Sequence, residues 1–508
     1  MTLVFTVILA GLSCTPINIT IVHTTDMHGW YYGHRHDASE DADIADLYSL
    51  ITLMKAKQTE HNIVLAIDSG DLIDGTGFSE LTRPKGRFVF DVMAKMPFDA
   101  MSIGNHELQN AESMTYMADS FVTAMSGRYL AGQTVHKSPS KSMGAPYRLV
   151  SLPNTQGRLL IIGFVLNMQS ASTEVTQQTV ETFLNDARLN PIWKDPTIKA
   201  IICPCHFGTN DGLVTTIKNK IRGHFPSTPV VFLCGHTHVT GVDTPDDNSI
   251  SQQAGFYFHN LGIVSFQLDV SASKTSNSLS NSRFEQIETI HTSSFSGPNS
   301  QSFTHDLWNS PEAVSIRDFV NLKVQSLGLN TQIGCSPRTW ILPKYGPKGT
   351  NEDRVFAMHL LRIRDDLKKG PVFVDDLYTI DMYNFAIYLF ANITGSDLNA
   401  LLISDSSMAN TDDDGSTEWF MENGQLFHLG GSNIRTNRAK NGKFKDDHNV
   451  GKVTPTEGKI YDLFVDSNIA GIVQNKLNKI APGKYSWKAT GTTFRPIFRK
   501  YIEEEMKC

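Results

Sequence analysis

The sequence is short of cysteine, of basic charge and of long apolar runs, and it contains no internal repeat. Six cysteines among 508 residues are too few for a disulfide framework. The formal net charge of −7 argues against a nucleic-acid polymer as the partner, because proteins that bind phosphate backbones carry a basic patch or stripe. After the first residues, no stretch has the length and apolarity of a membrane span, so no transmembrane anchor is predicted.

The residues that are present are typical of a globular protein, with 40% hydrophobic and 19% charged. A chain of this length exceeds what one hydrophobic core organises, so two large domains are expected. An apolar run over 3–12, followed by small residues, indicates a secretory signal at 1–14, although no Lys or Arg precedes it. A buried first strand is the alternative. The signal and two possible glycosylation sites, Asn18 and Asn392, predict a secreted protein or one of a secretory or vacuolar compartment.

Short apolar runs alternate with amphipathic stretches in the first half of the chain. Buried strands are expected at 17–23, 63–67, 100–103, 159–164, 200–203 and 230–233, and helices at 44–57 and 88–95. Strands and helices in alternation predict an α/β core, built from two sheets or from one sheet covered by helices.

The composition changes in the second half and suggests domain limits. Residues 271–302 are rich in Ser, Asn and Thr and poor in core formers, which is typical of a domain edge. Ser310, followed by Pro311 and a helical apolar spacing, predicts a connecting helix. We therefore expect a first domain over 15–300, a connecting segment over 301–333 and a second domain over 334–508.

Polar residues that can bind a metal follow five of the expected strands. They are Asp26, His28, Asp71, Asn105, His206, His236 and His238. Ligands of open α/β sheets lie beyond the carboxyl ends of the strands, so these side chains are expected to converge on one crevice.

The types and the number of these residues indicate the kind of metal site. Nitrogen and oxygen ligands without thiolate suit Zn²⁺, Mn²⁺, Fe²⁺ or Co²⁺. Seven ligands are too many for one tetrahedral ion and fit two divalent ions that share a bridging carboxylate, a pair typical of phosphoester hydrolysis. Cys203, Cys205 and Cys234 flank two of the strand ends and are expected to be buried thiols rather than ligands.

The order of these motifs resembles a known family. The series D-M-H, G-D, G-N-H-E, a lone His and G-H-T-H is similar to the calcineurin-like metallophosphoesterase superfamily over residues 19–266. H-T-T-D-M-H-G-W, G-N-H-E and the later G-C-S-P-R at 334–338 resemble its 5′-nucleotidase branch, including the fungal and protozoan members. The resemblance implies a four-layer α/β sandwich and a separate α+β C-terminal domain of the 5′-nucleotidase kind.

The resemblance also implies a role for each residue of the motifs. The first metal is held by Asp26, His28, Asp71 and His238. The second metal is held by Asp71, Asn105, His206 and His236, so Asp71 bridges the two. A metal-activated hydroxide attacks the phosphorus, and His106 lies beside the phosphate, where it stabilises charge and assists the leaving oxygen.

The chain departs from the family pattern after the catalytic histidine. The nucleotidase branch has G-N-H-E-F-D, in which the aspartate pairs with the histidine three residues earlier. Here a neutral Gln109 stands at that position. An amide stabilises the cationic imidazole less than a carboxylate does. We therefore expect His106 to be less readily protonated and the reaction to be slower or shifted to lower pH, unless another carboxylate such as Glu107 substitutes.

The second domain keeps less of the family pattern. Arg364 matches the arginine of the family's G-G-G-I-R motif and is the candidate substrate-binding residue, while Leu360, Leu361 and Arg362 replace the glycines. Since glycine permits a close backbone approach to a ligand, the base pocket is expected to be altered. The alternative is that Arg362 and Arg364 are surface residues or ion-paired. Residues 393–398 fit the L-T-G-x-x-L helix start of the family.

These observations predict a two-metal phosphomonoesterase, of the 5′-nucleotidase type, that releases phosphate from nucleoside monophosphates. The expected partner is thus a small-molecule phosphoester, a nucleotide by the resemblance. One alternative is the same metal chemistry on a nucleotide-sugar, a cyclic nucleotide or another phosphodiester. Another is a secreted binding protein that keeps the scaffold with weakened catalysis.

Overall fold

The chain forms two compact units in a computed structural model. The described residues are 16–36, 42–137, 140–168, 171–268, 284–291, 309–336, 354–359, 370–380, 386–405, 417–421, 426–429, 457–467 and 470–505. The first unit comprises residues 1–74 and 81–323, and the second comprises 75–80 and 324–508. The signal predicted at 1–14 and the binding role predicted for Arg364 concern residues outside the described ones.

One sheet of the first unit has six strands in the order β16-β15-β1-β2-β3-β4. These strands are β1 (Ile17–Thr24), β2 (Asn62–Asp68), β3 (Ala100–Ser102), β4 (Tyr129–Leu130), β15 (Asn260–Leu268) and β16 (Phe284–His291). From β1 to β4 the strands are parallel, whereas β15 runs antiparallel to β1. Helices α1 (Ile44–Ala56) and α3 (Arg87–Met93) lie in the connections between β1 and β2 and between β2 and β3, as expected for right-handed βαβ units.

The other sheet of this unit has seven strands, six of them in the order β13-β14-β12-β11-β8-β7. The strands are β7 (Arg148–Ser151), β8 (Arg158–Ile161), β9 (Phe164–Val165), β11 (Ile198–His206), β12 (Val230–Cys234), β13 (Thr240–Asp246) and β14 (Ser249–Ala254). The run expected as one strand over 159–164 is two strands, β8 and β9, both paired with β11. Gly163 lies between them, close to Leu130, where a β-carbon would contact the Leu130 side chain at 2.7 Å.

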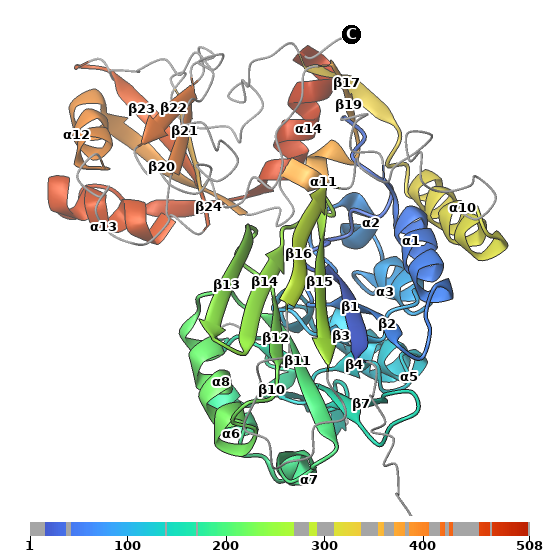
Figure 1. The fold of residues 1–508 in the computed structure, drawn as a ribbon. Helices are drawn as coiled ribbons and strands as arrows, with labels where there is room; N and C mark the ends of the chain where they lie inside the picture. The colour runs from blue at the N-terminus through green and yellow to red at the C-terminus, as the bar shows by residue number, and fades with distance from the viewer. Residues whose placement is uncertain are drawn as a thin grey trace, which may run out of the picture. The chain divides into compact units, whose positions relative to one another are not determined.

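Side chains of β11 alternate between two cores, with the period of two that a strand imposes. Ile202 belongs to the core between the sheets, together with Ile19 of β1. Its neighbour Ile201 belongs to the core on the other face of the sheet, together with Ile217 of α8 (Gly212–His224). Figure 1 shows α6 and α8 on one side of the paired sheets and α1 and α3 on the other. The predicted α/β fold is confirmed, as a four-layer sandwich.

The predicted connecting helix is present as α10 (Pro311–Ser326). The Ser310 hydroxyl accepts a hydrogen bond from the backbone near its start, as a helix cap does. From this helix, the Arg317 guanidinium donates to Asp43, at 2.6 Å, and to Asp46, at 2.7 Å. Asp43 caps the start of α1 and Asp46 closes its capping box, so the ion pairs fix α10 to the beginning of α1.

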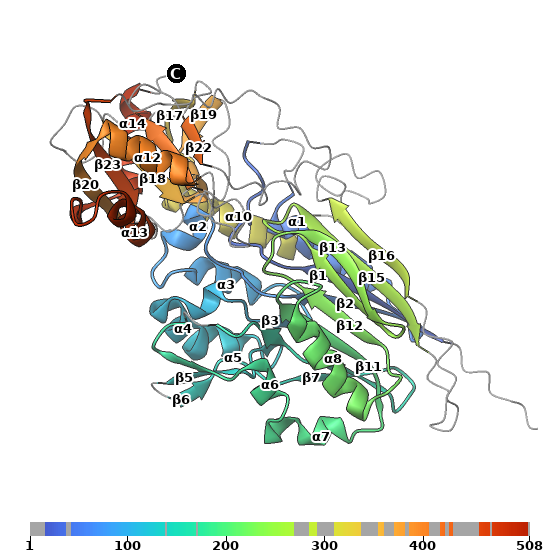
Figure 2. The ribbon, with the colours of Figure 1, turned by 90° about the vertical axis from the view of Figure 1, so that its left-hand side faces the viewer.

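The second unit is built on a six-stranded mixed sheet in the order β22-β21-β18-β23-β20-β24. Its strands are β18 (Arg354–His359), β20 (Ala386–Thr394), β21 (Thr417–Met421), β22 (Leu426–Leu429), β23 (Ile460–Asp466) and β24 (Trp487–Thr493). Helices α12 (Gly395–Asp405) and α13 (Ala470–Ile480) share a core with β20 and β23 that includes Leu398 and Leu463 (Figure 2). The helix start predicted from residues 393–398 is confirmed, because α12 begins at Gly395.

The remaining elements of this unit are short or terminal. Strands β17 (Gln332–Ser336) and β19 (Gly370–Phe373) pair antiparallel. Helix α11 (Asp376–Ile380) packs against α2 (Gly77–Glu80) and α14 (Phe494–Glu505). None of the described helices has the length and hydropathy needed to cross a membrane.

Candidate metal centre

Polar side chains cluster at one edge of the two sheets of the first unit. Strands β1, β2, β3, β11 and β12 end at or just before the residues that the sequence singles out. Within each sheet these strands are parallel, so their carboxyl ends meet at the same edge. Three overlapping groups of His and Asp offer ligand atoms that lie within 4.8 Å of one another. The predicted convergence of the strand ends is therefore what the structure shows.

The backbone at this edge is unusual, because five of the candidate ligands adopt the left-handed region. Their φ angles are 51° for Asp26, 47° for His28, 58° for Asp71, 73° for His236 and 54° for His238. In that region the β-carbon crowds the backbone, at a cost of roughly 1–2 kcal/mol for a residue with a side chain. Such strain persists where the surroundings dictate it and gathers at functional sites.

The first group consists of Asp26, His28 and His238. The Nε2 atom of His238 lies 3.3 Å from Asp26 Oδ1 and 3.0 Å from His28 Nε2. Two ring nitrogens at that separation, facing a carboxylate, form a donor set for one divalent cation. Asp26 and His28 are fully buried, while His238 is partly exposed at the edge.

The second group consists of Asp71, His206 and His236, with Asn105 beside them. The Nε2 atom of His206 lies 3.0 Å from Asp71 Oδ2, and the Nδ1 atom of His236 lies 2.8 Å from the Asn105 side-chain oxygen. Asp71 Oδ2 also lies 3.7 Å from His28 Nε2 of the first group. Asp71 thus stands between the two groups, as a bridging carboxylate must.

Two of the histidines are held so that one nitrogen faces the cluster. His28 Nδ1 lies 2.7 Å from the carbonyl of Ile73, and His206 Nδ1 lies 2.8 Å from the carbonyl of Ser69. A carbonyl only accepts, so both Nδ1 atoms carry a proton, and Nε2 is the ring nitrogen that remains for a metal ion. The buried Nε2 of His206 forms no hydrogen bond of good geometry among the described residues, although Asp71 Oδ2 lies 3.0 Å away. A metal ion would satisfy this orphaned atom, so the donor set fits divalent cations that prefer nitrogen and oxygen.

Glu107 supports the loop that carries Asp71. Its carboxylate accepts hydrogen bonds from the backbone N–H groups of Gly104, Asp71 and Leu72 at 2.8, 3.0 and 2.7 Å. Burial and the nearby Asp71 charge raise the pKa of Glu107 to about 8. Since its oxygens bind backbone amides, Glu107 is not the carboxylate that pairs with His106, and that possibility, raised from the sequence, is wrong.

The carboxylate beside His106 comes from Asp74 instead. His106 Nδ1 lies 2.8 Å from Asp74 Oδ2, and Lys85 Nζ lies 2.5 Å from Asp74 Oδ1. Burial raises the pKa of the Asp74 carboxyl, but the Lys85 charge and the His106 hydrogen bond outweigh it and hold that pKa well below its usual range. Gln109 is exposed. We expected a slower or acid-shifted reaction from Gln109 only if no other carboxylate pairs with His106. Asp74 is such a carboxylate, so the condition for that expectation is not met.

Sequence reasoning missed Asp74 and Lys85, and it missed the aromatic residues Phe256 and Tyr257 beside the first group. The Tyr257 ring stacks on Trp30 at 4.1 Å between centroids and meets His28 edge-on at 5.6 Å, while Phe256 stacks on His238 at 5.0 Å. Asp74 lies three residues after Asp71, a spacing that could have marked it. Phe256 and Tyr257 come from the loop between β14 and β15, which lies outside the metal-binding motifs of the sequence. The three predicted buried thiols are confirmed as free and buried.

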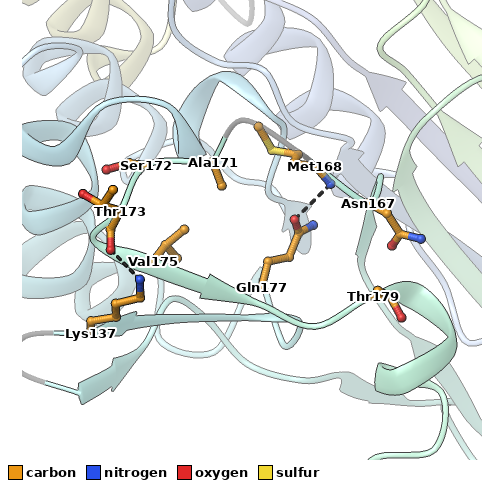
Figure 3. A pocket seen from close by; sticks show the side chains of 9 residues that line it. All are labelled: Lys137, Asn167, Met168, Ala171, Ser172, Thr173, Val175, Gln177 and Thr179. Carbon is orange, nitrogen blue, oxygen red and sulfur yellow. Dashed lines mark hydrogen bonds between the residues drawn. The ribbon is translucent and has the colours of Figure 1, made fainter.

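A separate hollow lies on the small sheet of this unit, formed by β5 (Thr134–Lys137), β6 (Ser140–Ser142) and β10 (Val175–Gln177). It has a volume of about 280 Å³ and is lined by Lys137, Asn167, Met168, Ala171, Ser172, Thr173, Val175, Gln177 and Thr179. Figure 3 shows that Lys137 and Gln177 bind backbone groups of Thr173 and Met168. None of the candidate ligands lines it, so this hollow is distinct from the metal cluster.

The first unit matches a family model. Residues 19–240 match the calcineurin-like phosphoesterase family, a range that contains all seven candidate ligands and His106. Metal ions belong to the chemistry of that family, and the ligand groups described above lie inside the matched range.

Several relatives share part of the sequence. The chain is 26% identical over 363 residues to an uncharacterized protein of Schizosaccharomyces pombe, which covers 67% of this chain and 60% of that protein. It is 27% identical over 259 residues to a secreted protein of Arthroderma benhamiae, covering 49% of this chain and 38% of that one. The chain therefore spans less than two thirds of the length of these two relatives. A 5′-nucleotidase of Vibrio parahaemolyticus is 28% identical over 154 residues, 29% of this chain and 25% of that protein.

Solved structures resemble both units. The 5′-nucleotidase from Candida albicans superposes with a TM-score of 0.74 at 17% identity, over 96% of this chain and 97% of that one. The 5′-nucleotidase precursor from Thermus thermophilus gives a TM-score of 0.61 at 14% identity, over 97% of each chain. At such identities the likeness establishes the fold, and it does so across nearly the whole chain.

Proposed function

We propose that this chain, in which residues 19–240 form a calcineurin-like metallophosphoesterase domain, is a two-metal phosphomonoesterase of nucleoside monophosphates. The observation that carries the proposal is the pair of ligand groups around Asp71. Asp26, His28 and His238 would hold one ion, and Asn105, His206 and His236 the other, with Asp71 shared. Bound there, two divalent ions supply Lewis-acid activation of water and of the phosphoryl oxygens.

The chain's own residues set the orientation of the reacting groups. His106 Nε2 lies 3.7 Å from Asp71 Oδ2, so this nitrogen faces the place where both ions would bind. When both ring nitrogens carry a proton, Nε2 can donate a hydrogen bond to a phosphoryl or leaving oxygen and stabilise the charge that develops in the transition state. Asn105 acts through its neutral side-chain oxygen, which adds a ligand without adding charge. The buried floor of the cluster excludes bulk water and strengthens these electrostatic interactions.

The nucleoside part of the proposal rests on the fold of the whole chain. The two solved structures described above, from Candida albicans and Thermus thermophilus, are named as a 5′-nucleotidase and a 5′-nucleotidase precursor, and the structural match to them extends into the second unit. We propose that the second unit binds the nucleoside and that Arg364, outside the described residues, contributes to this binding. Replacing Arg364 by Ala should then raise KM for a nucleotide and leave KM for a small aryl phosphate unchanged.

Export of the protein is part of the same proposal. Cys335 is disulfide-bonded, and its partner lies outside the described residues because the other described cysteines are free. Disulfides persist in oxidising compartments, and a relative is named a secreted protein. Amino-terminal sequencing of the mature protein tests the predicted signal at 1–14. An uncleaved amino terminus in the native host would contradict it.

The direct test measures metal content and substrate preference together. Purified protein should hold two divalent ions per chain and release phosphate from AMP faster than from a diester such as a cyclic nucleotide or bis-aryl phosphate. Turnover of diesters alone would replace the proposed substrate class by the phosphodiester alternative. Two bound ions with no turnover of any phosphoester would favour the alternative of a binding protein on the same scaffold.

A further inference from the structure

We infer that Asp74, braced by Lys85, is the residue that positions His106, in the place that the family pattern assigns to residue 109. The inference rests on the proposed function, since His106 acts there on a phosphoester. It deepens that function because it assigns a positioning role to Asp74 and Lys85, which lie outside the family motifs described for this sequence. In the sequence pattern alone, the residue expected to pair with His106 is the neutral Gln109.

The imidazole of His106 is fixed by contacts on its two nitrogens. Nδ1 lies 2.8 Å from Asp74 Oδ2, while Nε2 faces Asp71 Oδ2 at 3.7 Å. An ionised carboxylate can only accept, so Nδ1 carries the proton and Nε2 is directed toward the candidate metal centre. The ring also packs edge-on against His28, at 5.0 Å between centroids.

Asp74 is itself held by charge and by its backbone. Lys85 Nζ lies 2.5 Å from its other carboxylate oxygen, and both side chains are largely buried, with 4% and 17% of their surface exposed. Residue 74 has a φ of 70°, and the preceding backbone N–H groups of Leu72 and Ile73 bind Glu107. The same short loop thus carries the bridging Asp71 and Asp74, so the carboxylate that orients His106 is fixed relative to the candidate bridge.

The position that the family uses is turned away here. Gln109 is exposed and ends the short helix η1 (His106–Leu108), with its backbone N–H donating to the His106 carbonyl. The carboxylate at hydrogen-bond distance from His106 thus belongs to the loop after β2, 32 residues earlier in the sequence. Lys85 lies against it, because a buried carboxylate needs a cation close by.

The test compares Asp74→Asn with wild type on two monoesters. The amide keeps the shape of the side chain but loses the charge, so kcat for AMP should fall about 10- to 100-fold while KM and the content of two metals stay unchanged. The loss should be smaller for 4-nitrophenyl phosphate, whose leaving group needs little protonation. Lys85→Met should show the same pattern, and Lys85→Arg should retain activity.

Two control variants and one spectroscopic measurement make the outcome decisive. Gln109→Ala should leave kcat unchanged, and so should Asp119→Asn, which neutralises an exposed aspartate paired with Lys141. Long-range ¹H–¹⁵N NMR on histidine-labelled protein, with the His106 signal assigned by its loss in His106→Gln, should show the proton on Nδ1 in wild type and a changed tautomer population in Asp74→Asn.

The NMR measurement separates this inference from the proposed function. An inactive wild type whose His106 shows this dependence on Asp74 would remove the proposed function and retain the positioning role. An active wild type with kcat and tautomer unchanged in Asp74→Asn would overturn the inference alone. An equal loss on both monoesters, accompanied by loss of metal, would also overturn it, because Asp74 would then support the metal site.

Discussion

At the residue scale, the candidate metal centre depends on residues whose backbone adopts an unfavourable conformation. Asp26, His28, Asp71, His236 and His238 all have positive φ angles, where glycine would be free of strain. The turns place the ligands beyond the strand ends and direct them back toward one point. A tight turn and a metal-binding side chain are both needed at these positions, and the strain is the cost of having both.

Asp71→Asn should remove both metals together, because the bridging carboxylate serves each ion. The content measured by inductively coupled plasma mass spectrometry should fall from two ions per chain to none at micromolar metal. Activity on AMP should fall by at least about 1,000-fold, the scale of losing a central catalytic group. Asp119→Asn provides the matched charge control. Two tightly bound ions in Asp71→Asn would contradict the bridging role.

Gly104→Ala should weaken metal binding through a steric collision. A β-carbon there would lie 2.2 Å from both the backbone nitrogen and the Oδ1 atom of Asp71. We expect metal affinity to fall about 10- to 100-fold and stability to fall by about 1–3 kcal/mol. Gly212→Ala is the control, since nothing lies within 4 Å of its added β-carbon. Isothermal titration with Zn²⁺ or Mn²⁺ and urea unfolding measure the two effects, and equal behaviour of the two variants would contradict the prediction.

At the scale of the element, the sequence predicted the strands and the candidate ligands that follow them. It did not predict the contacts between loops. The expected runs at 17–23, 63–67 and 230–233 correspond to β1, β2 and β12 within one residue at each end. Continuous apolar runs of strand length, each followed by polar residues, supported those predictions. The pairing of Asp74 with His106 joins residues 32 apart through two irregular loops. No periodicity encodes that contact, and only the folded backbone brings the two together.

The ion pair that ties α8 to β13 gives a pH-dependent prediction. Arg222 donates to both oxygens of Asp246, at 2.8 and 2.9 Å, and this hydrogen bonding lowers the pKa of Asp246 to about 2. Because the folded pKa lies below the unfolded value near 3.9, the pair stabilises fully above about pH 4 and loses its effect as the pH falls toward 2. Arg222→Met should lower stability by about 1–3 kcal/mol at pH 7.

The measurement for this pair is urea unfolding of wild type and Arg222→Met at several pH values. The difference in unfolding free energy should be constant from pH 7 to 5 and should shrink below pH 4. Lys141→Met, at the exposed ion pair with Asp119 in the same unit, is a control in which a smaller loss is expected. A difference that persists unchanged at pH 3 would contradict the assignment to Asp246.

At the scale of the whole molecule, the candidate centre lies between two sheets that also share an apolar core. Asp26, His28 and Asp71 follow strands of one sheet, while His206 and His236 follow strands of the other. The length of the chain predicted two domains, and the structure divides into two compact units. The altered base pocket of the second domain stays a prediction, since Arg364 and its neighbours lie outside the described residues.

Metal removal should therefore destabilise the first unit. Two ions held at 100 times their dissociation constants contribute about 2.7 kcal/mol each. Excess chelator should lower the transition of this unit by roughly 10–20 °C in differential scanning calorimetry, at about 2–4 °C for each kcal/mol. Asp71→Asn should show no such shift, because it has no ions to lose. An equal shift in wild type and variant would mean that the chelator acts elsewhere.

The left-handed turns also bear on the history of the chain. A lineage that no longer needed the ions would gain stability by exchanging Asp or His for Gly or Asn at each of the five turns, and random substitution would supply such changes repeatedly. Asp26, His28, Asp71, His236 and His238 instead all keep ligand side chains on unfavourable backbone. Descendants that have lost the chemistry should be recognisable by glycine or asparagine at these positions, in advance of any change in the cores of the sheets.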